Sequence, residues 1–146
     1  MGLHSELRRI WEADPEAVAA VPLSKVFKGK VPDKYLDPAG KILNLDVPYL
    51  VVWSNDGDVT GGTSQTIEAA TIVSFNIFHS KSAEAERIRG IVRRLYENAV
   101  LDYADPLEVF QDISIDAFGE LPEENGVYEF FQRFKVESAI IRPQRP

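Results

Sequence analysis

An acidic, glycine-containing stretch between residues 55 and 64 is the part of the sequence that most resembles a metal site. Four residues match positions one, three, five and six of an EF-hand loop: Asp56, Asp58, Thr60 and Gly61. Position twelve is Ile67 instead of a bidentate glutamate, and the flanking sequences are typical of strands, not helices. Two carboxylates alone make a weak oxygen site. Metal binding by Asp56, Asp58 and Thr60 is therefore only a weak alternative.

The same stretch is also a poor phosphate site. It lacks a GxxxxGK[ST] motif and any Lys or Arg, and its carboxylates would repel an anion. Asn, Asp and Gly are, however, the residues that tight turns require. The sequence therefore predicts that residues 55–64 form the tip of a β-hairpin that projects from a sheet and is able to dock on a neighbour.

Nucleophilic and metal-dependent catalysis have no sequence signature here. A GxSxG motif is absent, and His4 and His79, the only histidines, belong to neither an HxxxH nor an HExxH pattern. The chain has no cysteine, which removes disulfides, thiolate ligands and cysteine nucleophiles and is consistent with a reducing cytosol. We therefore expect no catalytic residue, no cofactor and no enzymatic activity.

Carboxylates are abundant, and two of them keep a hydrolase open as a rival hypothesis. Asp112 and Asp116 alternate with Ser114 on one side of a predicted strand. A paired-acid hydrolase needs two carboxylates across a cleft, which a sequence does not show. The competing interpretation is an ordinary solvated face.

Composition and charge limit the range of partners. The formal net charge of −7 argues against nucleic acid as the main partner, because phosphate binding needs clustered Lys and Arg. The longest apolar run, Tyr49 to Trp53, is far too short to cross a bilayer, and the first residues lack the apolar core of a secretion signal. We expect a soluble chain with no membrane partner and no sequence-specific nucleic acid partner.

The N-terminal third combines a helix with a long irregular segment. Four apolar residues share one stripe of a helix: Leu3, Leu7, Ile10 and Trp11. Asp14-Pro15 ends this helix or restarts it as a short turn through Val21. Residues 22–46 are predicted to be a long loop with one short strand around Val26-Phe27. Loops of this length in a compact domain often contact a partner.

Two strands and a helix follow. VPYLVVW, residues 47–53, is a β-branched and aromatic run that predicts a strand. Apolar residues then alternate through TIEAATIVSFNIFHS, which predicts a long strand with one face on a core. Ser80 or Ser82 is expected to cap a helix over residues 82–100. Gly90 within it predicts close packing of the helix on the sheet, where a side chain would not fit.

The last third predicts two more strands joined by a turn. One strand face is formed by Leu107, Val109, Ile113, Ile115 and Ala117, and the other strand by Tyr128, Phe130, Phe134 and Val136. LPEENG supplies the turn, with Asn125-Gly126 suited to positive φ. The prediction is one α+β domain, residues 1–146: a mostly antiparallel sheet of about four strands, a long helix packed on one face, an N-terminal helix, and an extended tail at residues 142–146.

The opposite strand faces are not purely polar. They carry Ile72, Phe78, Phe110, Phe118, Val127 and Phe131. One interpretation is that the N-terminal helix, with Leu7 and Trp11, covers this second face. The other is that part of the face meets another subunit, since large apolar patches usually mark interfaces. The candidate interface residues are Phe110, Phe118 and Phe131, with Asp56 and Asp58 of the hairpin.

In its order of elements the chain resembles the phage tail terminator or tail completion proteins, the small family that caps the tail tube of long-tailed phages. The similarity runs from about Leu3 to about Ser138. It includes the N-terminal amphipathic helix, the PYLVV strand and TIEAATIVSFNIFHS. It continues through the helix SAEAERIRGIVRRLYENAV and ends in the aromatic strand VYEFFQRFKVES.

This resemblance implies a structural protein without catalytic residues. It implies a ring, a hexamer in this family, which stops tube polymerisation and joins the tail to the head. The implied partners are other copies of the chain, the tail tube protein and the head-connector protein, within a virion component assembled in the host cytoplasm. An acidic ring lumen would repel DNA during its passage. The alternative hypothesis is a dimeric, ferredoxin-like module that binds a small ligand or serves regulation.

Overall fold

The computed structural model describes residues 2–43, 45–55, 57–101 and 108–142, with side chains described from residue 112 onward in the last of these ranges. Its helices are α1 (Leu3–Ala13), α2 (Pro15–Ala20) and α3 (Ser82–Tyr96), with 3-10 turns η1 (Leu23–Lys25) and η2 (Asp33–Tyr35). Its strands are β1 (Val26–Lys28), β2 (Tyr49–Ser54), β3 (Asp58–Gly62), β4 (Thr66–His79), β5 (Glu108–Glu124) and β6 (Val127–Ile141).

The six described strands form one mixed sheet in the order β1-β2-β4-β6-β5, and β3 pairs with β4 beyond the end of β2. Among the described strand pairs, only β1 and β2 are parallel. β4 pairs with β6 along its whole length, from Thr66 opposite Ile141 to His79 opposite Tyr128. The α+β prediction is confirmed, but the expected count of about four strands is too low, because two short strands, β1 and β3, lie in segments that were predicted mainly as loops.

Alternation along β4 and β6 predicts the buried face correctly. Val73, Phe75 and Ile77 of β4 are almost fully buried, as are Phe130, Phe134 and Val136 of β6. The buried residues of β4 and β6 lie on the same face because directly opposed residues of antiparallel strands share one face of a sheet. These side chains form the centre of the main core.

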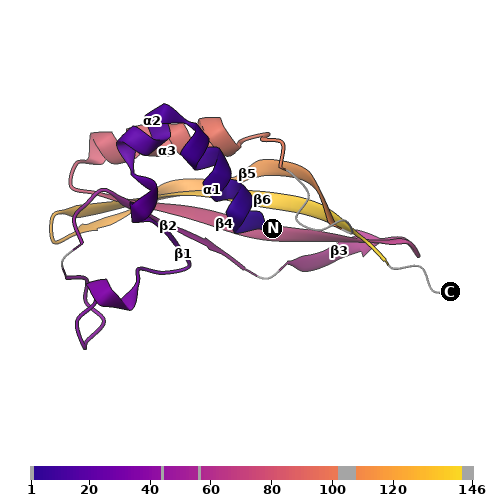
Figure 1. Cartoon of the computed structure of the whole chain (residues 1–146), viewed down its shortest axis with the longest axis horizontal. Helices are drawn as coiled ribbons and strands as arrows, with labels where there is room; N and C mark the ends of the chain where they lie inside the picture. The colour runs from indigo at the N-terminus through magenta and orange to yellow at the C-terminus, as the bar shows by residue number, and fades with distance from the viewer. Residues whose placement is uncertain (1, 44, 56, 102–107, 143–146) are drawn as a thin grey trace.

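All three helices lie on the same face of the sheet (Figure 1). α3 contributes buried residues Ala85, Ile88, Ile91, Val92 and Tyr96, and α1 contributes Leu7 and Trp11 to the same cluster. The Trp11 indole donates a hydrogen bond of 2.9 Å to the carbonyl of Val21. The expectation that α1 covers the second face is therefore wrong: its apolar stripe packs beside α3 instead.

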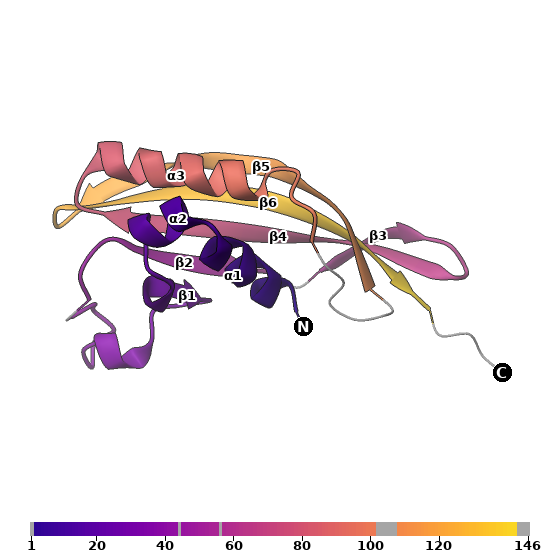
Figure 2. The same cartoon turned by 45° about the horizontal axis from the view of Figure 1, so that its top comes forward.

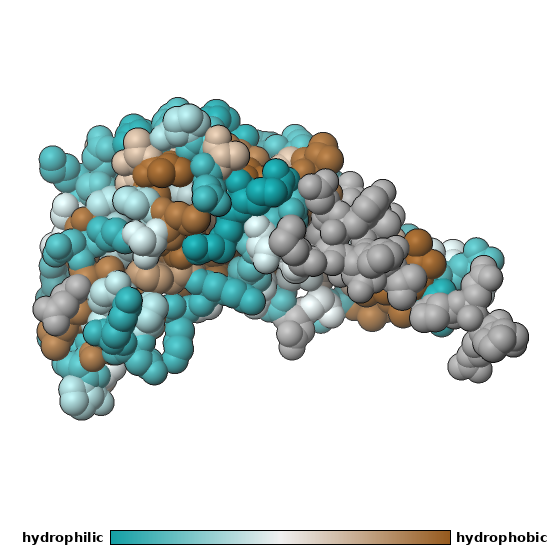
Figure 3. Space-filling view, in the orientation of Figure 1, coloured by the Kyte–Doolittle hydropathy of each residue, from teal (hydrophilic) through white to brown (hydrophobic). Residues whose placement is uncertain are grey.

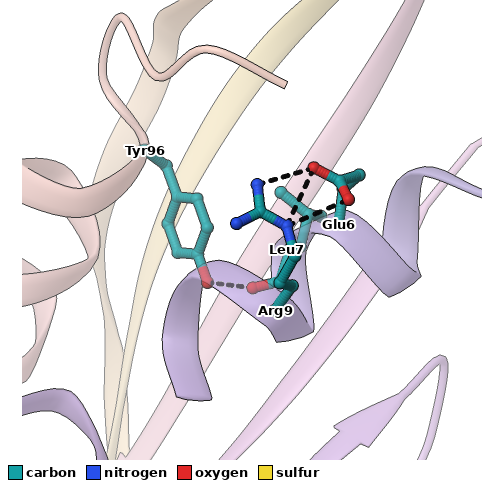
Figure 4. Close-up of polar contacts among 4 residues, drawn as sticks. All are labelled: Glu6, Leu7, Arg9 and Tyr96. Carbon is teal, nitrogen blue, oxygen red and sulfur yellow. Dashed lines mark hydrogen bonds and ion pairs between the residues drawn. The ribbon is translucent and has the colours of Figure 1, made fainter. Parts of the chain in front are cut away.

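Tyr96, at the end of α3, joins the two long helices to the sheet. Its ring stacks on Phe75 at 4.5 Å and meets Phe134 edge-on at 6.2 Å. Its hydroxyl donates a 2.7 Å hydrogen bond to the carbonyl of Leu7 in α1 (Figure 4). Burial raises the pKa of the Tyr96 hydroxyl. One side chain thus fixes the position of α1 relative to both α3 and the sheet.

Charged side chains support the same arrangement. On α1, the Arg9 guanidinium binds the buried Glu6 carboxylate at 2.9 Å (Figure 4). Asp14 caps α2 by accepting from the Ala17 amide, and Arg94 of α3 donates to both Asp14 oxygens at 3.1 and 3.3 Å. These bonds, with that from Arg94 the largest cause, lower the pKa of Asp14. Asp14-Pro15 therefore ends one helix and restarts another, as the sequence predicts.

The segment after β1 covers part of the second face. A smaller apolar cluster there contains Phe27, Val31, Tyr49 and Val51, with Tyr35, Leu36, Leu45, Val47 and Phe78 packed against it. The predicted strand at Val26-Phe27 is confirmed as β1, and it pairs with β2. In Figure 1 this segment lies below the sheet, at the end opposite the β3–β4 hairpin. No helix of the described residues lies over the rest of the second face.

Three local predictions for α3 need correction. The helix ends at Tyr96, not at Val100, and its N-cap is Lys81, which makes no side-chain capping bond. Gly90 is exposed, and a Cβ placed there would meet nothing within 4 Å. Close packing on the sheet therefore does not explain this glycine.

The β5–β6 hairpin turns at Asn125 and Gly126, with φ of 53° and 78°. The predicted positive-φ turn is thus confirmed, and its twist matches that of the strands it joins. The turn is shorter than LPEENG, because β5 continues to Glu124. β5 also contains three register irregularities, after Phe110, Ile115 and Leu121.

Replacing Gly90 with alanine is expected to stabilise the protein by about 0.5–1 kcal/mol. The substitution removes the conformational freedom that glycine has in the unfolded chain and adds no clash. Urea denaturation followed by circular dichroism measures the change. Gly126→Ala is the control and should lose stability, because its φ of 78° is unfavourable for a side chain. A loss of stability in Gly90→Ala would show that this position is packed.

Candidate assembly interface

The β3–β4 hairpin extends away from the helices as an arm at one end of the sheet, where β4 stays paired with β6 (Figures 1 and 2). All five residues of β3 are exposed. The strand pairs with β4 from Asp58 opposite Ala70 to Gly62 opposite Ile67. At the tip, the Thr63 amide donates to the Thr66 carbonyl at 2.9 Å. The predicted projecting hairpin is confirmed, although most of what was expected to be loop is strand.

Two polar features explain why the chain forms this arm. Asn55 joins β2 to β3 by accepting from the Ile72 amide at 2.8 Å through its side chain and donating to the Ile72 carbonyl at 3.2 Å. Gly62 has a φ of 142°, and a Cβ there would lie 2.5 Å from the Thr66 carbonyl oxygen. Asn and Gly are thus required by the geometry of the hairpin, not by a ligand.

The calcium interpretation does not fit this geometry. Asp58 and Thr60 lie on an extended strand, which does not wrap around a common point as an EF-hand loop does. Asp56 lies outside the described residues. Among the residues that are described, no group of three His, Cys, Asp or Glu side chains gathers closely enough to hold an ion.

Two apolar side chains are exposed at this end of the sheet. Val59 is 72% exposed and lies opposite Ala69, on the side of the sheet that the helices cover elsewhere. Ile141, opposite Thr66 at the end of β6, is 42% exposed. Figure 3 shows hydrophobic surface at this narrow end of the molecule. Apolar side chains on a protruding arm are a feature of contact surfaces.

A second candidate surface lies on the uncovered part of the second face. There the Arg133 guanidinium stacks on the Trp53 ring at 5.7 Å and on the Phe131 ring at 4.8 Å. Its Nε is buried and has no hydrogen-bond partner among the described residues. Gly119, on the neighbouring strand, makes room for Phe131, because a Cβ there would lie 3.0 Å from the ring. These stacked, amphipathic side chains are of the types enriched at protein interfaces.

A chain of hydrogen bonds continues across this face toward the smaller cluster. The Ser74 hydroxyl donates to the Asn76 side-chain oxygen at 2.7 Å, and the Asn76 amide donates to Glu129 at 2.6 Å. Tyr49, which stacks on Phe78 at 4.6 Å, lies near Glu129. Burial, aided by the Glu129 charge, raises the pKa of Tyr49 to about 12. The groups of this face are thus held by contacts with one another.

The structure separates two of the predicted interface residues. Phe131 is half-buried on the second face, whereas Phe118 is 55% exposed and lies opposite Gln132 on the helix face. Grouping Phe118 with Phe131 on one face is therefore wrong. The bulge between Ile115 and Ala117 adds a residue and reverses the alternation. The side chain of Phe110 lies outside the described residues.

Phe118 is instead held by α3. The Arg93 guanidinium stacks on its ring at 4.5 Å and that of Arg89 at 5.6 Å. Arg89 also donates to the Gly119 carbonyl at 3.0 Å. The interface roles of Phe118, Phe131 and Asp58 stay predictions. Sequence reasoning missed Arg133 and Val59; the signal for Val59 was a single apolar residue between Asp58 and Thr60.

Each of the two histidines makes a hydrogen bond to a nearby group. His4 Nε2 lies 2.9 Å from the Ser54 hydroxyl, and burial, then the Lys28 charge, lowers its pKa. His79 accepts from the Lys81 amide at 3.0 Å, and burial lowers its pKa as well. A groove of about 550 Å³ lies between residues 41–47 and the β5–β6 turn, with Leu45, Val47 and Phe78 in its wall.

Comparison with solved structures identifies the fold. No protein-family model and no curated protein matches the chain. A chain of the virion of a native gene transfer agent (GTA) particle matches with a TM-score of 0.72 and 14% identity, covering 94% of both chains. This fold occurs in a virion. A second solved chain matches with a TM-score of 0.46 and 13% identity, covering 99% of this chain and 100% of that one. None of the helices in the described ranges is long and apolar enough to span a bilayer.

Changing Asp58 to asparagine is expected to leave the melting temperature unchanged within about 1 °C, both with calcium and with a chelator. The side chain is exposed on β3 and holds no ion in the hairpin interpretation. Thermal unfolding followed by circular dichroism measures the melting temperature, with the wild type under the same two conditions as the control. A calcium-dependent rise in the wild-type melting temperature that Asp58→Asn abolishes would instead establish a metal site. The shift expected for a surface substitution is small because such changes are usually within about 0.5 kcal/mol.

Proposed function

We propose that this chain is a structural protein of a phage or prophage virion that caps the tail tube and joins tail to head as a ring. One observation carries the proposal: the chain shares its fold, over 94% of both lengths, with a chain of a gene transfer agent virion. The order of its elements, which resembles that of the tail terminator family, supports the more specific role. Its partners are then further copies of itself, the tail tube protein and the head-connector protein.

The surfaces of the molecule support assembly. A ring needs two different contact surfaces on each subunit, so that each copy binds one neighbour on each side. The β3–β4 arm lies at one end of the sheet, and the segment covering the second face lies at the other (Figure 1). The arm is exposed along all of β3 and has Val59 on its surface. In this proposal the arm reaches a neighbouring copy or the tube, with Asp58 at the contact.

A structural role also fits the acidic residues that suggested a hydrolase. Asp112 and Asp116 are both exposed on the edge strand β5. Neither residue lines the 550 Å³ groove. Asp112 and Asp116 are thus surface charges, and the proposed function gives them no catalytic role.

The groove supports one alternative, a dimeric module that binds a small apolar ligand. Its wall includes Ile42, Leu45, Val47 and Phe78, and its volume of about 550 Å³ is in the range of ligand sites. Glu124 and Glu129 also line it, however. A ligand there would have to be compatible with two carboxylates.

Light scattering behind a sizing column, over a wide range of concentrations, tests the proposal. We expect a species of six times the 16.4 kDa chain mass, or a monomer that converts to it as the concentration rises. Either result would support the ring. A strict dimer at all concentrations would contradict it and favour the ligand-binding module.

A charge at Phe131 is expected to weaken self-association more than folding. Phe131→Glu puts a carboxylate beside Arg133 on the uncovered face, where it would be desolvated in an interface. Val100→Glu, at a position that is 87% exposed, is the matched control. Light scattering gives the association and urea denaturation the stability of each variant. If Phe131→Glu unfolds the chain while Val100→Glu does not, Phe131 belongs to the core.

A further inference from the structure

The two outer edges of the sheet carry opposite charge. β1 and β5 are the outermost strands in the described sheet. β5 has six acidic residues and neither Lys nor Arg along its 17 positions. Those with described side chains are all exposed: Asp112, Asp116, Glu120, Glu123 and Glu124. Much of the net charge of −7 is therefore concentrated on a single edge.

The opposite edge is basic. Lys25, Lys28 and Lys30 lie at or beside the three-residue strand β1, and residues 21–32 include no acid. Lys28 and Lys30 are exposed. Lys30 makes one exposed ion pair, with Asp33 at 3.4 Å, and such a pair in water contributes little stability. This lysine edge is accordingly available to a stronger acidic partner.

Arginines near the acidic edge are directed elsewhere. Arg89 and Arg93 of α3 stack on Phe118, and Arg89 donates to the carbonyl of Gly119. Arg93 lies 3.4 Å from the Gln132 side-chain oxygen. Both guanidinium groups thus face rings and amide oxygens. The β5 carboxylates keep their excess of negative charge at the side of the sheet.

Charge on an edge strand has a simpler explanation, and the test must distinguish it from a specific contact between subunits. Acids, lysines and bulges all blunt an edge against pairing with another strand, and β5 has three irregularities in its register. Charge of either sign protects an edge strand from pairing with another strand. A specific contact requires opposite sign, because like charges across an interface oppose association. Two β5 edges repel each other, so symmetric pairing through β5 is disfavoured.

We propose that the acidic β5 edge of one copy binds the lysine edge at β1 of the next copy. The inference rests on the ring of the proposed function and names the surfaces that form it. Because the two edges differ, the contact is heterologous: each copy uses one edge on each side. Repetition of such a contact closes into a ring when the rotation per subunit allows. The partner on both edges is therefore a second copy of this chain.

Charge reversal at either edge tests the contact. The acidic-edge variant is Asp112→Lys with Asp116→Lys, and the lysine-edge variant is Lys28→Glu with Lys30→Glu. Glu86→Lys with Glu97→Lys, on exposed positions of α3 and just after it, is the control with the same change of net charge as the acidic-edge variant. All substituted side chains are exposed. Circular dichroism checks that each variant is folded.

Each edge variant alone should need a concentration roughly a hundredfold higher to form the ring, since charges of like sign then face each other at the substituted positions. An equimolar mixture should restore the ring, because the substituted edge of one variant then meets the substituted edge of the other, and the unsubstituted edges meet as in the wild type. The control should assemble as the wild type does. If Asp112→Lys with Asp116→Lys fails to fold, Asp112→Asn with Asp116→Asn replaces it. This milder change removes the two negative charges without reversing them and should weaken assembly.

The outcomes separate this inference from the proposed function. A wild-type ring together with unchanged assembly of both edge variants would show that the charges only blunt the edges, and the inference would fail alone. Loss of the ring in each variant without restoration in the mixture would also contradict the pairing of edges. A wild type that stays monomeric at every concentration would count against the ring itself and so against both.

Discussion

The packing of Tyr96 is the constraint on which the rest of the structure depends. Its ring lies on Phe75 and Phe134, and its hydroxyl bonds to the Leu7 carbonyl of α1. Because a buried hydroxyl needs a partner, α1 must lie beside α3 on the same face of the sheet. The second face is then left to the segment after β1, which covers only one end of it. The position of Arg133 on a face without a described helix is thus a consequence of where the helices pack.

The sequence predicted the faces of β4 and β6 but not that of β5, and the reason is physical. Alternation marks a face only while the register is unbroken, and β4 pairs with β6 without a bulge from Thr66 to His79. β5 gains an extra residue near Asp116, so Phe118 passes to the helix face. Nothing in the local sequence marks this bulge, since the register depends on the partner strand. Likewise, the stripe on α1 indicates burial without indicating which face it covers.

The hairpin was the part of the candidate site that the sequence specified best. Asn and Gly identify a turn because few other residues tolerate its backbone, and Gly62 confirms this through the close approach of the Thr66 carbonyl. Strand β3 itself was missed, because Val59 stands alone between polar residues. Its pairing with β4, itself backed by β6 along its full length, makes the hairpin an ordered arm. An arm ordered in advance loses less entropy when it binds than a loose loop would.

The position of the acidic residues changes what the net charge means. An acidic ring lumen would need carboxylates that face the channel, but six acids lie along β5. If that edge contacts the three lysines of the next copy, the carboxylates lie in the subunit contact, where half of their charge is offset, and they do not face the DNA. The acids that remain free to line a channel include three on the second face at the arm end of the sheet: Asp58, Glu68 and Glu137, which lie on adjacent strands. Edge pairing and an acidic lumen are then compatible only if the arm, and not β5, borders the channel.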